Sequence, residues 1–272
     1  MKLSIVLLMV LGPALSSAAV VIEESFESGK AAPGWSIGSQ SGGRVWFDTE
    51  SAHRGKYSLK ASYPIPKGAL YAWADFNVAK YQTYEVKVEF WARMPDAKQG
   101  LKFMKVFGIR DSEGYANTTL GIDYTGTNNG SIWNIHYGDG AVEKANDAGN
   151  YIAFNGAEAK FVGRSYGLAG NIVDTPQYQV WDSKNWGTDW HHFSVHIKYN
   201  SGTSVATEKN DGEYRVAIDG VTYVDAVGLF NRHWSNKPIE RIVFFDWAQT
   251  GDQPFTVAID DVKITIPDAK KR

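Results

Sequence analysis

The sequence predicts an all-β domain built as a sandwich or a barrel of antiparallel strands. Apolar and polar residues alternate with a period of two in several segments, as expected for strands with one buried face. Gly and Asn are spread evenly between these segments and supply the turns that short strands require. No long segment shows a helical period. Strands at short spacing with turns between them are typical of sandwiches and barrels.

Two segments show the alternation most clearly. In 84–94 (YEVKVEFWARM) the even-numbered residues from Tyr84 to Phe90 are predicted to face one way and the odd-numbered residues the other. In 190–200 (WHHFSVHIKYN) the odd-numbered residues from Phe193 to Tyr199 form the apolar face. These two segments are therefore predicted to be strands with one face in the core.

Further strands complete the prediction along the chain. A hairpin turning at Asp219–Gly220 is expected to join 214–218 to 221–224. The chain closes with strands at 241–247 and 255–266. Segment 126–176 alternates less cleanly and is expected to form long loops, which on a rigid sandwich commonly carry function.

Residues 1–19 have the pattern of a secretory signal peptide. Lys2 precedes a short apolar run, and small residues end the segment at Ala18 and Ala19. The run is too short for a spanning helix and contains Gly12 and Pro13. The sequence therefore predicts a secreted protein, extracellular or periplasmic, whose mature chain does not insert into a membrane.

No repeat or linker interrupts residues 20–267, so they are predicted to form one domain, followed by a charged tail at 268–272. The chain has no cysteine, which excludes thiolate zinc sites and cysteine nucleophiles. A domain of this size buries enough surface to be stable without disulfides. The net charge of −2 offers no basic surface for nucleic acid. Nothing in the sequence indicates the oligomeric state or an organic cofactor.

Several segments resemble the concanavalin A-like lectin/glucanase superfamily, in particular its jelly-roll polysaccharide lyases and carbohydrate-binding modules. They cover about half of the chain, and they are mostly core and turn positions, so they bear on architecture more than on activity. The resemblance implies a two-sheet antiparallel jelly-roll sandwich and a polysaccharide as the partner. The segments are SFESG and PGW at 25–35, AHRGKYSLKASY at 52–63, TDWHHFSVHIKYN at 188–200, DGEYRVAIDG at 211–220 and TVAIDDVKI at 256–264.

The same resemblance implies a structural calcium ion. In similar modules a glutamate of the first strand, backbone oxygens of the turn and an aspartate of the last strand hold the ion, and these positions are Glu27, the neighbourhood of Gly55 and Asp260. Asp260 and Asp261 face opposite ways on a regular strand, so only one can reach a common ion unless a bulge intervenes. The alternative is that Glu27 and the Asp pair only face solvent.

Glycoside hydrolysis is not expected. It requires two carboxylates at a fixed separation, and the single-strand carboxylate motif of the superfamily's hydrolases is missing. Glu85 and Glu89 share a strand face but lie about 13 Å apart, beyond the usual separations.

Lyase chemistry needs a base for the C5 proton of a uronate, a group that neutralises its carboxylate and an acid for the leaving oxygen. One region of the chain supplies such residue types, and NIHYG resembles the Gln-Ile-His element of alginate lyases, with Asn134 in place of the glutamine. The Arg-x-Glu-x-Arg and Tyr-x-Lys-x-Gly-x-Tyr strands of those enzymes are missing. For His136 the alternative is a histidine bonded to a loop carbonyl. The candidate catalytic residues are Lys105, Arg110, Tyr124, His136 and Tyr137.

Substrate binding is expected to use aromatic and cationic side chains. Trp91 lies on the polar side of its strand, where burial does not require an indole, with Lys87 and Arg93 available for carboxylates. The alternative for Trp91 is a second, outer core beneath a loop. His192 and His196 lie about 13 Å apart on a strand and cannot bind one zinc ion, so they are expected on a polar sheet face. Trp133 and Asn134 are further candidates.

Three functions fit these observations: a polysaccharide lyase acting on an acidic glycan, a non-catalytic glycan-binding protein, and an adhesive surface protein. The cluster of Lys, Arg, His and Tyr favours the lyase, and the missing catalytic strands favour binding. The lyase is the first hypothesis and glycan binding is its alternative.

Overall fold

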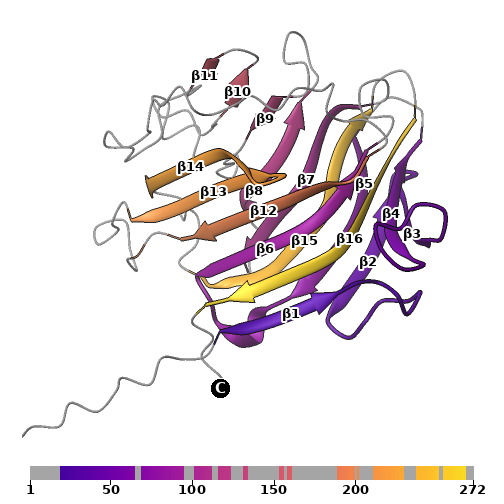
Figure 1. Ribbon diagram of the computed structural model, residues 1–272, viewed down its shortest axis with the longest axis horizontal. Coiled ribbons are helices and arrows are strands. Elements are labelled where there is room, and N and C mark those ends of the chain that lie inside the picture. The colour runs from indigo at the N-terminus through magenta and orange to yellow at the C-terminus, as the bar shows by residue number, and fades with distance from the viewer. Residues whose placement is uncertain are drawn as a thin grey trace, which may run out of the picture.

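The computed structural model describes residues 19–64, 69–94, 101–111, 116–123, 131–133, 153–155, 158–160, 189–199, 201, 211–229, 237–250 and 254–267. Their strands form two antiparallel sheets that pack face to face (Figure 1). This is the predicted all-β jelly-roll sandwich. In the described part of the chain, no helix is long and apolar enough to cross a bilayer.

The first sheet, called sheet A, has eight strands in the order β14-β13-β12-β6-β16-β4-β3, and β1 also pairs with β16. Two strands pair with the same edge of β16: β4 pairs with its first half and β1 with its second half. The strands are β1 (Val20–Glu24), β3 (Arg44–Asp48), β4 (Ser58–Tyr63), β6 (Glu85–Arg93), β12 (His191–Lys198), β13 (Gly212–Ile218), β14 (Val221–Leu229) and β16 (Phe255–Ile266).

The second sheet, sheet B, also has eight strands, in the order β11-β10-β9-β8-β7-β15-β5-β2. The short 3₁₀ helix η1 (Ala79–Tyr81) connects β5 to β6. The strands are β2 (Trp35–Gln40), β5 (Ala69–Asn77), β7 (Leu101–Asp111), β8 (Ala116–Asp123), β9 (Ser131–Trp133), β10 (Ala153–Asn155), β11 (Glu158–Lys160) and β15 (Ile239–Thr250).

The core lies between the sheets and is rich in aromatic rings. Phe90 of β6 stacks on Phe107 of β7 with ring centroids 6.0 Å apart and meets Phe244 of β15 edge-on at 5.2 Å. The predicted alternation holds in both central strands: the residues at every second position are buried in β6 from Val86 and in β12 from Phe193. Each sheet therefore has one face on the core and one outer face turned away from it.

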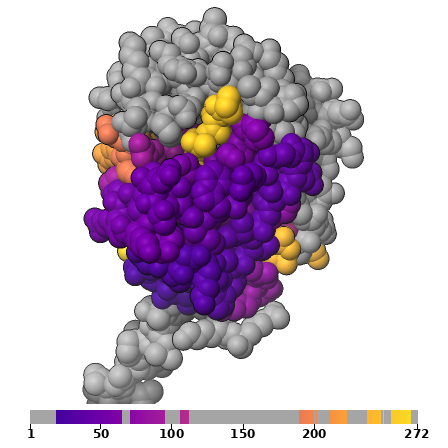
Figure 2. Space-filling model, turned by 90° about the vertical axis from the view of Figure 1, so that its right-hand side faces the viewer, coloured from indigo at the N-terminus to yellow at the C-terminus, as the bar shows by residue number. Residues whose placement is uncertain are grey.

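Some sequence expectations change or fall outside the described residues. The alternation predicts that Tyr84 faces the core with Val86, but Tyr84 precedes β6 and is 40% exposed. Residues 1–18 of the expected signal segment and the tail 268–272 are not among the described residues. Most of 126–176 is also outside them, and the described parts contain β9, β10 and β11. The side of the molecule that carries β2, β3 and β4 is built mainly from the N-terminal part of the chain, shown in indigo and purple (Figure 2).

Candidate functional site

The outer face of sheet B carries charged and aromatic side chains. On β5, Ala74 and Phe76 are buried in the core, so the alternating positions Trp73 and Asp75 lie on the outer face. On β7, Phe107 and Ile109 are in the core, which puts Arg110 on the outer face. These strands all pair with β15 or its neighbours, so their side chains lie on one continuous surface.

A β-bulge in β15 places Asp246 on this surface. Phe244 pairs with Phe107, but Trp247 pairs with Lys105, so β15 has one extra residue here. Phe244 and Phe245 are both in the core, and Phe245 has a left-handed φ of 69°. The Tyr63 hydroxyl donates a hydrogen bond to the Phe245 carbonyl, and burial raises the Tyr63 pKa well above its usual value of 10, so this donor keeps its proton.

Four charged residues form a cluster on the outer face, called here the Arg–Asp cluster: Asp75, Arg110, Arg241 and Asp246. Arg110 forms an ion pair with Asp246, and Arg241 Nη1 lies 3.6 Å from Asp75 Oδ2. The Arg110 Nε atom is buried and has no hydrogen-bond partner. Because a buried donor without a partner costs about 1–3 kcal/mol, this nitrogen favours a ligand that brings an acceptor.

The electrostatics of the cluster are set by burial. Burial raises the pKa of the Asp75 carboxyl above its usual value of 3.8, while Arg241 and Arg110 lower it and Asp246 raises it. A carboxylate with a raised pKa is a stronger proton acceptor than an ordinary one. The cluster therefore holds both cations for an anionic ligand and a carboxylate with perturbed basicity, a combination common at functional sites.

Trp73 lies close against the neighbouring edge strand, β2. It pairs across the sheet with Gly38 of β2, where a Cβ atom would be only 2.2 Å from Trp73 Cζ2. Only glycine leaves room for the indole to rest on the strand backbone. A ring held in this way beside a charged cluster is suited to stacking on a flat, partly apolar ligand.

The predicted catalytic residues divide into described and undescribed positions. Arg110 belongs to the Arg–Asp cluster, and the Lys105 backbone lies in β7 opposite Trp247 and Gly121. Tyr124, Asn134, His136 and Tyr137 lie outside the described residues, and the backbone of Trp133 ends β9. In the chain, Tyr124 follows β8 and Asn134 follows β9, and both strands belong to sheet B.

Most of the predicted binding residues lie on the other sheet. Lys87, Trp91 and Arg93 occupy the outer face of β6, and His192 and His196 the outer face of β12. His196 Nε2 lies 2.8 Å from Glu85 Oε1, and His192 Nε2 lies 3.9 Å from Glu89 Oε1. The core separates this face from the Arg–Asp cluster, so these five binding candidates do not share a surface with Arg110.

Trp91 is covered by the loop between β3 and β4. The His53 imidazole stacks on it with centroids 3.9 Å apart and planes inclined by 16°, and His192 lies 5.2 Å from its ring. Trp190 meets His53 edge-on at 5.8 Å. These contacts correspond to the alternative of an outer core beneath a loop, and a sugar-binding role for Trp91 stays a prediction.

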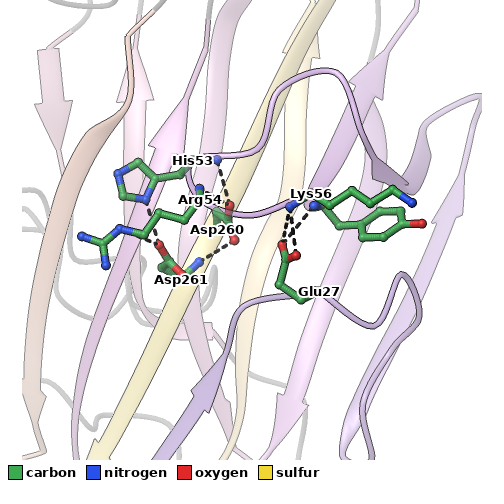
Figure 3. A network of polar contacts seen from close by, with 7 residues as sticks. Glu27, His53, Arg54, Lys56, Asp260 and Asp261 are labelled. Carbon is green, nitrogen blue, oxygen red and sulfur yellow. Dashed lines mark hydrogen bonds and ion pairs between the residues drawn. The ribbon is translucent and has the colours of Figure 1, made fainter.

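Glu27 and Asp260 both hold the turn at 53–57 (Figure 3). The Glu27 carboxylate accepts hydrogen bonds from the backbone N–H groups of Lys56 and Tyr57. Asp260 is fully buried and accepts from the N–H groups of His53, Arg54 and Asp261. The backbone donors lower the Glu27 pKa, whereas burial raises the Asp260 pKa to about 6.

A second bulge brings both aspartates of β16 to this turn. The register with β6 shifts between Asp260 and Lys263, and Asp261 has a left-handed φ of 47°. Asp261 Oδ2 therefore reaches His53 Nδ1 at 2.8 Å while Asp260 bonds the His53 backbone. Within the described ranges, no group of three or more His, Asp or Glu side chains could hold a metal ion.

Sequence reasoning missed four residues of the sheet B surface: Trp73, Asp75, Arg241 and Asp246. The pair on β5, Trp73 and Asp75, lies far in the sequence from the pair on β15, Arg241 and Asp246, and only the pairing of these strands brings them together. Gly38 opposite Trp73 gave one usable signal, since glycine inside a strand indicates a close approach of another group.

Comparisons with solved structures show the fold. No protein-family model and no curated protein sequence matches the chain. An endo-β-1,4-glucuronan lyase from the fungus Trichoderma reesei is similar, with a TM-score of 0.58, 15% identity and 89% of this chain and 94% of that chain covered. The cellulose-induced protein Cip1 is also similar, with a TM-score of 0.54, 18% identity and 89% of this chain and 96% of that chain covered. The alginate lyase Aly36B has a TM-score of 0.51 and 14% identity, with 92% of this chain and 97% of that chain covered. The chain therefore has the two-sheet jelly-roll fold that these three proteins share, as its sequence predicted.

Proposed function

We propose that this protein is a carbohydrate-active enzyme that cleaves a uronate-containing polysaccharide by β-elimination on the outer face of sheet B. The observation that carries the proposal is Arg110, whose guanidinium lies on that face with a buried, unpartnered Nε. Two similar structures that cover most of the chain are lyases of uronate polymers by their names.

In this proposal Arg110 and Arg241 bind and neutralise the uronate carboxylate, which acidifies the neighbouring C5 proton. Bidentate donors of this kind match a carboxylate better than a lysine does. Trp73 stacks on an adjacent sugar ring and fixes its orientation.

The proton transfers complete the reaction. A base takes the C5 proton, the C4–C5 double bond forms, and the C4 oxygen leaves with its electron pair and receives a proton from an acid. We propose that His136, together with Tyr124 or Tyr137, supplies the acid and the base. Lys105 is a further cation for the carboxylate. Asp75, with its raised pKa, holds Arg241 and maintains the charge balance of the cluster.

The experiment incubates the protein with glucuronan, alginate, ulvan and pectate and follows the ultraviolet absorbance of the unsaturated product. Arg110→Lys should lower kcat/KM by at least about tenfold, since a point charge cannot reproduce the guanidinium geometry. Arg215→Lys on the outer face of sheet A is the matched control and should retain full activity. Absence of product from all four polymers would remove the lyase proposal.

Glycan binding without catalysis is the second candidate. Trp73 on Gly38 favours it, because an aromatic platform binds sugars without any acid or base. Retardation on a polysaccharide affinity gel, with no unsaturated product, would identify this function. Neither retardation nor product would instead favour the adhesive role.

We also propose that a structural calcium ion binds near the turn at 53–57. Glu27 Oε2 and Asp260 Oδ1 each accept a single backbone N–H, so each keeps a lone pair for a cation. These two carboxylates would hold the ion together with backbone oxygens of the turn, as calcium prefers. Its contribution would be to tie the start of the chain to β16, not to take part in the reaction.

A further inference from the structure

A cavity of about 200 Å³ opens on the outer face of sheet A, away from the Arg–Asp cluster. Its lining residues are Glu50, Ser51, Lys60, Arg93, Thr256 and Ala258. They come from β4, β6, β16 and the loop after β3.

The sheet register explains why this space exists. Lys60 of β4 pairs with Ala258 of β16, and Ala258 pairs with Arg93 of β6, so the three residues form a row across the sheet. The methyl group of Ala258 is short, which leaves a hollow between two long cationic side chains. Glu50 and Ser51 close one side of the hollow from the loop.

The two cations of the cavity differ in their partners. Lys60 Nζ lies 3.4 Å from Asp48 Oδ2 and 5.7 Å from the centre of the Trp46 ring, so the protein already compensates its charge. Arg93 has no ion pair in the described part of the chain, and its Nε atom is buried without a hydrogen-bond partner. Because a buried donor without a partner costs free energy, the Arg93 Nε favours an acceptor in the cavity, and the positive charge of the guanidinium favours an anionic one.

The other lining groups indicate what kind of anion fits. Thr256 offers a hydroxyl group, and the Glu50 carboxylate accepts hydrogen bonds from hydroxyl donors. Ser51 Oγ already donates to Asp48 Oδ2, so toward a ligand it acts as an acceptor. Trp46 lies in the same face, directly opposite Lys60 in the β3–β4 pair. The volume is below the ~300–1,000 Å³ of pockets for drug-sized ligands, which fits one sugar residue better than an oligosaccharide.

We propose that this cavity is a second glycan site that binds one uronate residue of an acidic polysaccharide, with its carboxylate on Arg93. The substrate class rests on the proposed function, but the site is distinct from the sheet B surface because the core separates the two. A long polymer can engage both sites of one molecule, which raises its apparent affinity by avidity, whereas a short oligosaccharide engages only one at a time.

The test measures binding of a glucuronate tetrasaccharide by calorimetry in an Arg110→Ala background, in which the sheet B site is disabled. Binding should persist there, and adding Arg93→Gln should weaken it by at least about tenfold. Ala258→Val fills the hollow without changing charge and should have the same effect. Lys263→Gln, an exposed cation on the same face of β16, is the control and should leave the Kd unchanged.

Two results would overturn the proposal: no tetrasaccharide binding in Arg110→Ala, or equal Kd values with and without Arg93→Gln in variants with unchanged melting temperatures. Failure of the proposed function is read separately, as absence of unsaturated product in the wild type. With an active enzyme, Arg93→Gln should raise KM on the polymer and leave kcat and the KM on the tetrasaccharide at wild-type values.

Discussion

The His53 imidazole lies on the Trp91 indole, with ring centroids 3.9 Å apart and planes inclined by 16°. His53 also bonds Asp261 through its ring and Asp260 through its backbone. One residue of the β3–β4 loop thus connects the outer face of β6 to the bulge of β16.

His53→Ala should therefore lower the free energy of unfolding by about 1–2 kcal/mol, from the lost ring pair and the lost contact with Asp261. Urea denaturation measures this loss. Arg54→Ala is the control, because its side chain is 77% exposed and should contribute little. If His53→Ala instead tightened glycan binding, Trp91 would be a sugar platform that His53 partly covers.

Tyr63→Phe should destabilise the protein by about 1–3 kcal/mol, because the buried Phe245 carbonyl loses its donor. The bulge of β15 then loses a restraint, and Asp246 and its partner Arg110 lose their fixed positions, so kcat/KM should fall as well. Tyr57→Phe serves as the control. Unchanged stability in Tyr63→Phe would show that the bulge holds without this bond.

Gly38→Ala should displace Trp73, since the new Cβ would overlap the indole. We expect KM for a uronate polymer to rise about two- to tenfold, with kcat nearly unchanged, because stacking contributes to substrate binding. Ser36→Ala, a substitution on the same face of β2, is the matched control and should leave KM unchanged. An unaltered KM in Gly38→Ala would exclude Trp73 from the binding surface.

Asp260 should make stability fall as the pH rises from about 4 to about 6 in the presence of a chelator. Its folded-state pKa of about 6 lies above the usual 3.8, so the native state holds the proton to higher pH than the unfolded state does. Below this window both states are protonated, and above it both are ionised. The difference between the two pKa values lowers the free energy of unfolding by up to about 3 kcal/mol across this pH range. Asp260→Asn, which does not titrate, should flatten the profile of unfolding free energy against pH.

Calcium should raise the melting temperature and remove most of that pH dependence, because a bound cation lowers the pKa of its carboxylate ligands. Glu27→Gln should reduce the increase, while magnesium, which demands octahedral geometry, should replace calcium poorly. Identical melting curves with calcium and with chelator would exclude the ion.

The strands could be predicted because alternation is a local property. Val86, Val88 and Phe90 are buried where the period of two placed them. The two bulges could not be predicted. Neither FFD at 244–246 nor IDD at 259–261 has a sequence feature which indicates that one strand carries an extra residue opposite its neighbour.

The candidate site was predictable only in part for a related reason. Arg110 was found from its residue type, but its partner Asp246 lies 136 positions further along the chain. The packing of the whole core determines which strands pair. A contact between residues as far apart in the sequence as Arg110 and Asp246 therefore cannot be predicted from either segment alone. The alternation alone puts Arg93 on the polar side of β6, yet its cavity depends on the short side chain of Ala258 on another strand.

The pairing of β1 with β16 has a consequence for engineering. Val20 lies opposite Ile266, so the two ends of the fold meet at one place on sheet A. A short linker could join them, and the chain could be reopened at the exposed turn Asp219–Gly220 to give a circular permutant. Such a permutant would move the point of attachment to a surface or a fusion partner to the far side of sheet A and so control which face meets an insoluble polymer.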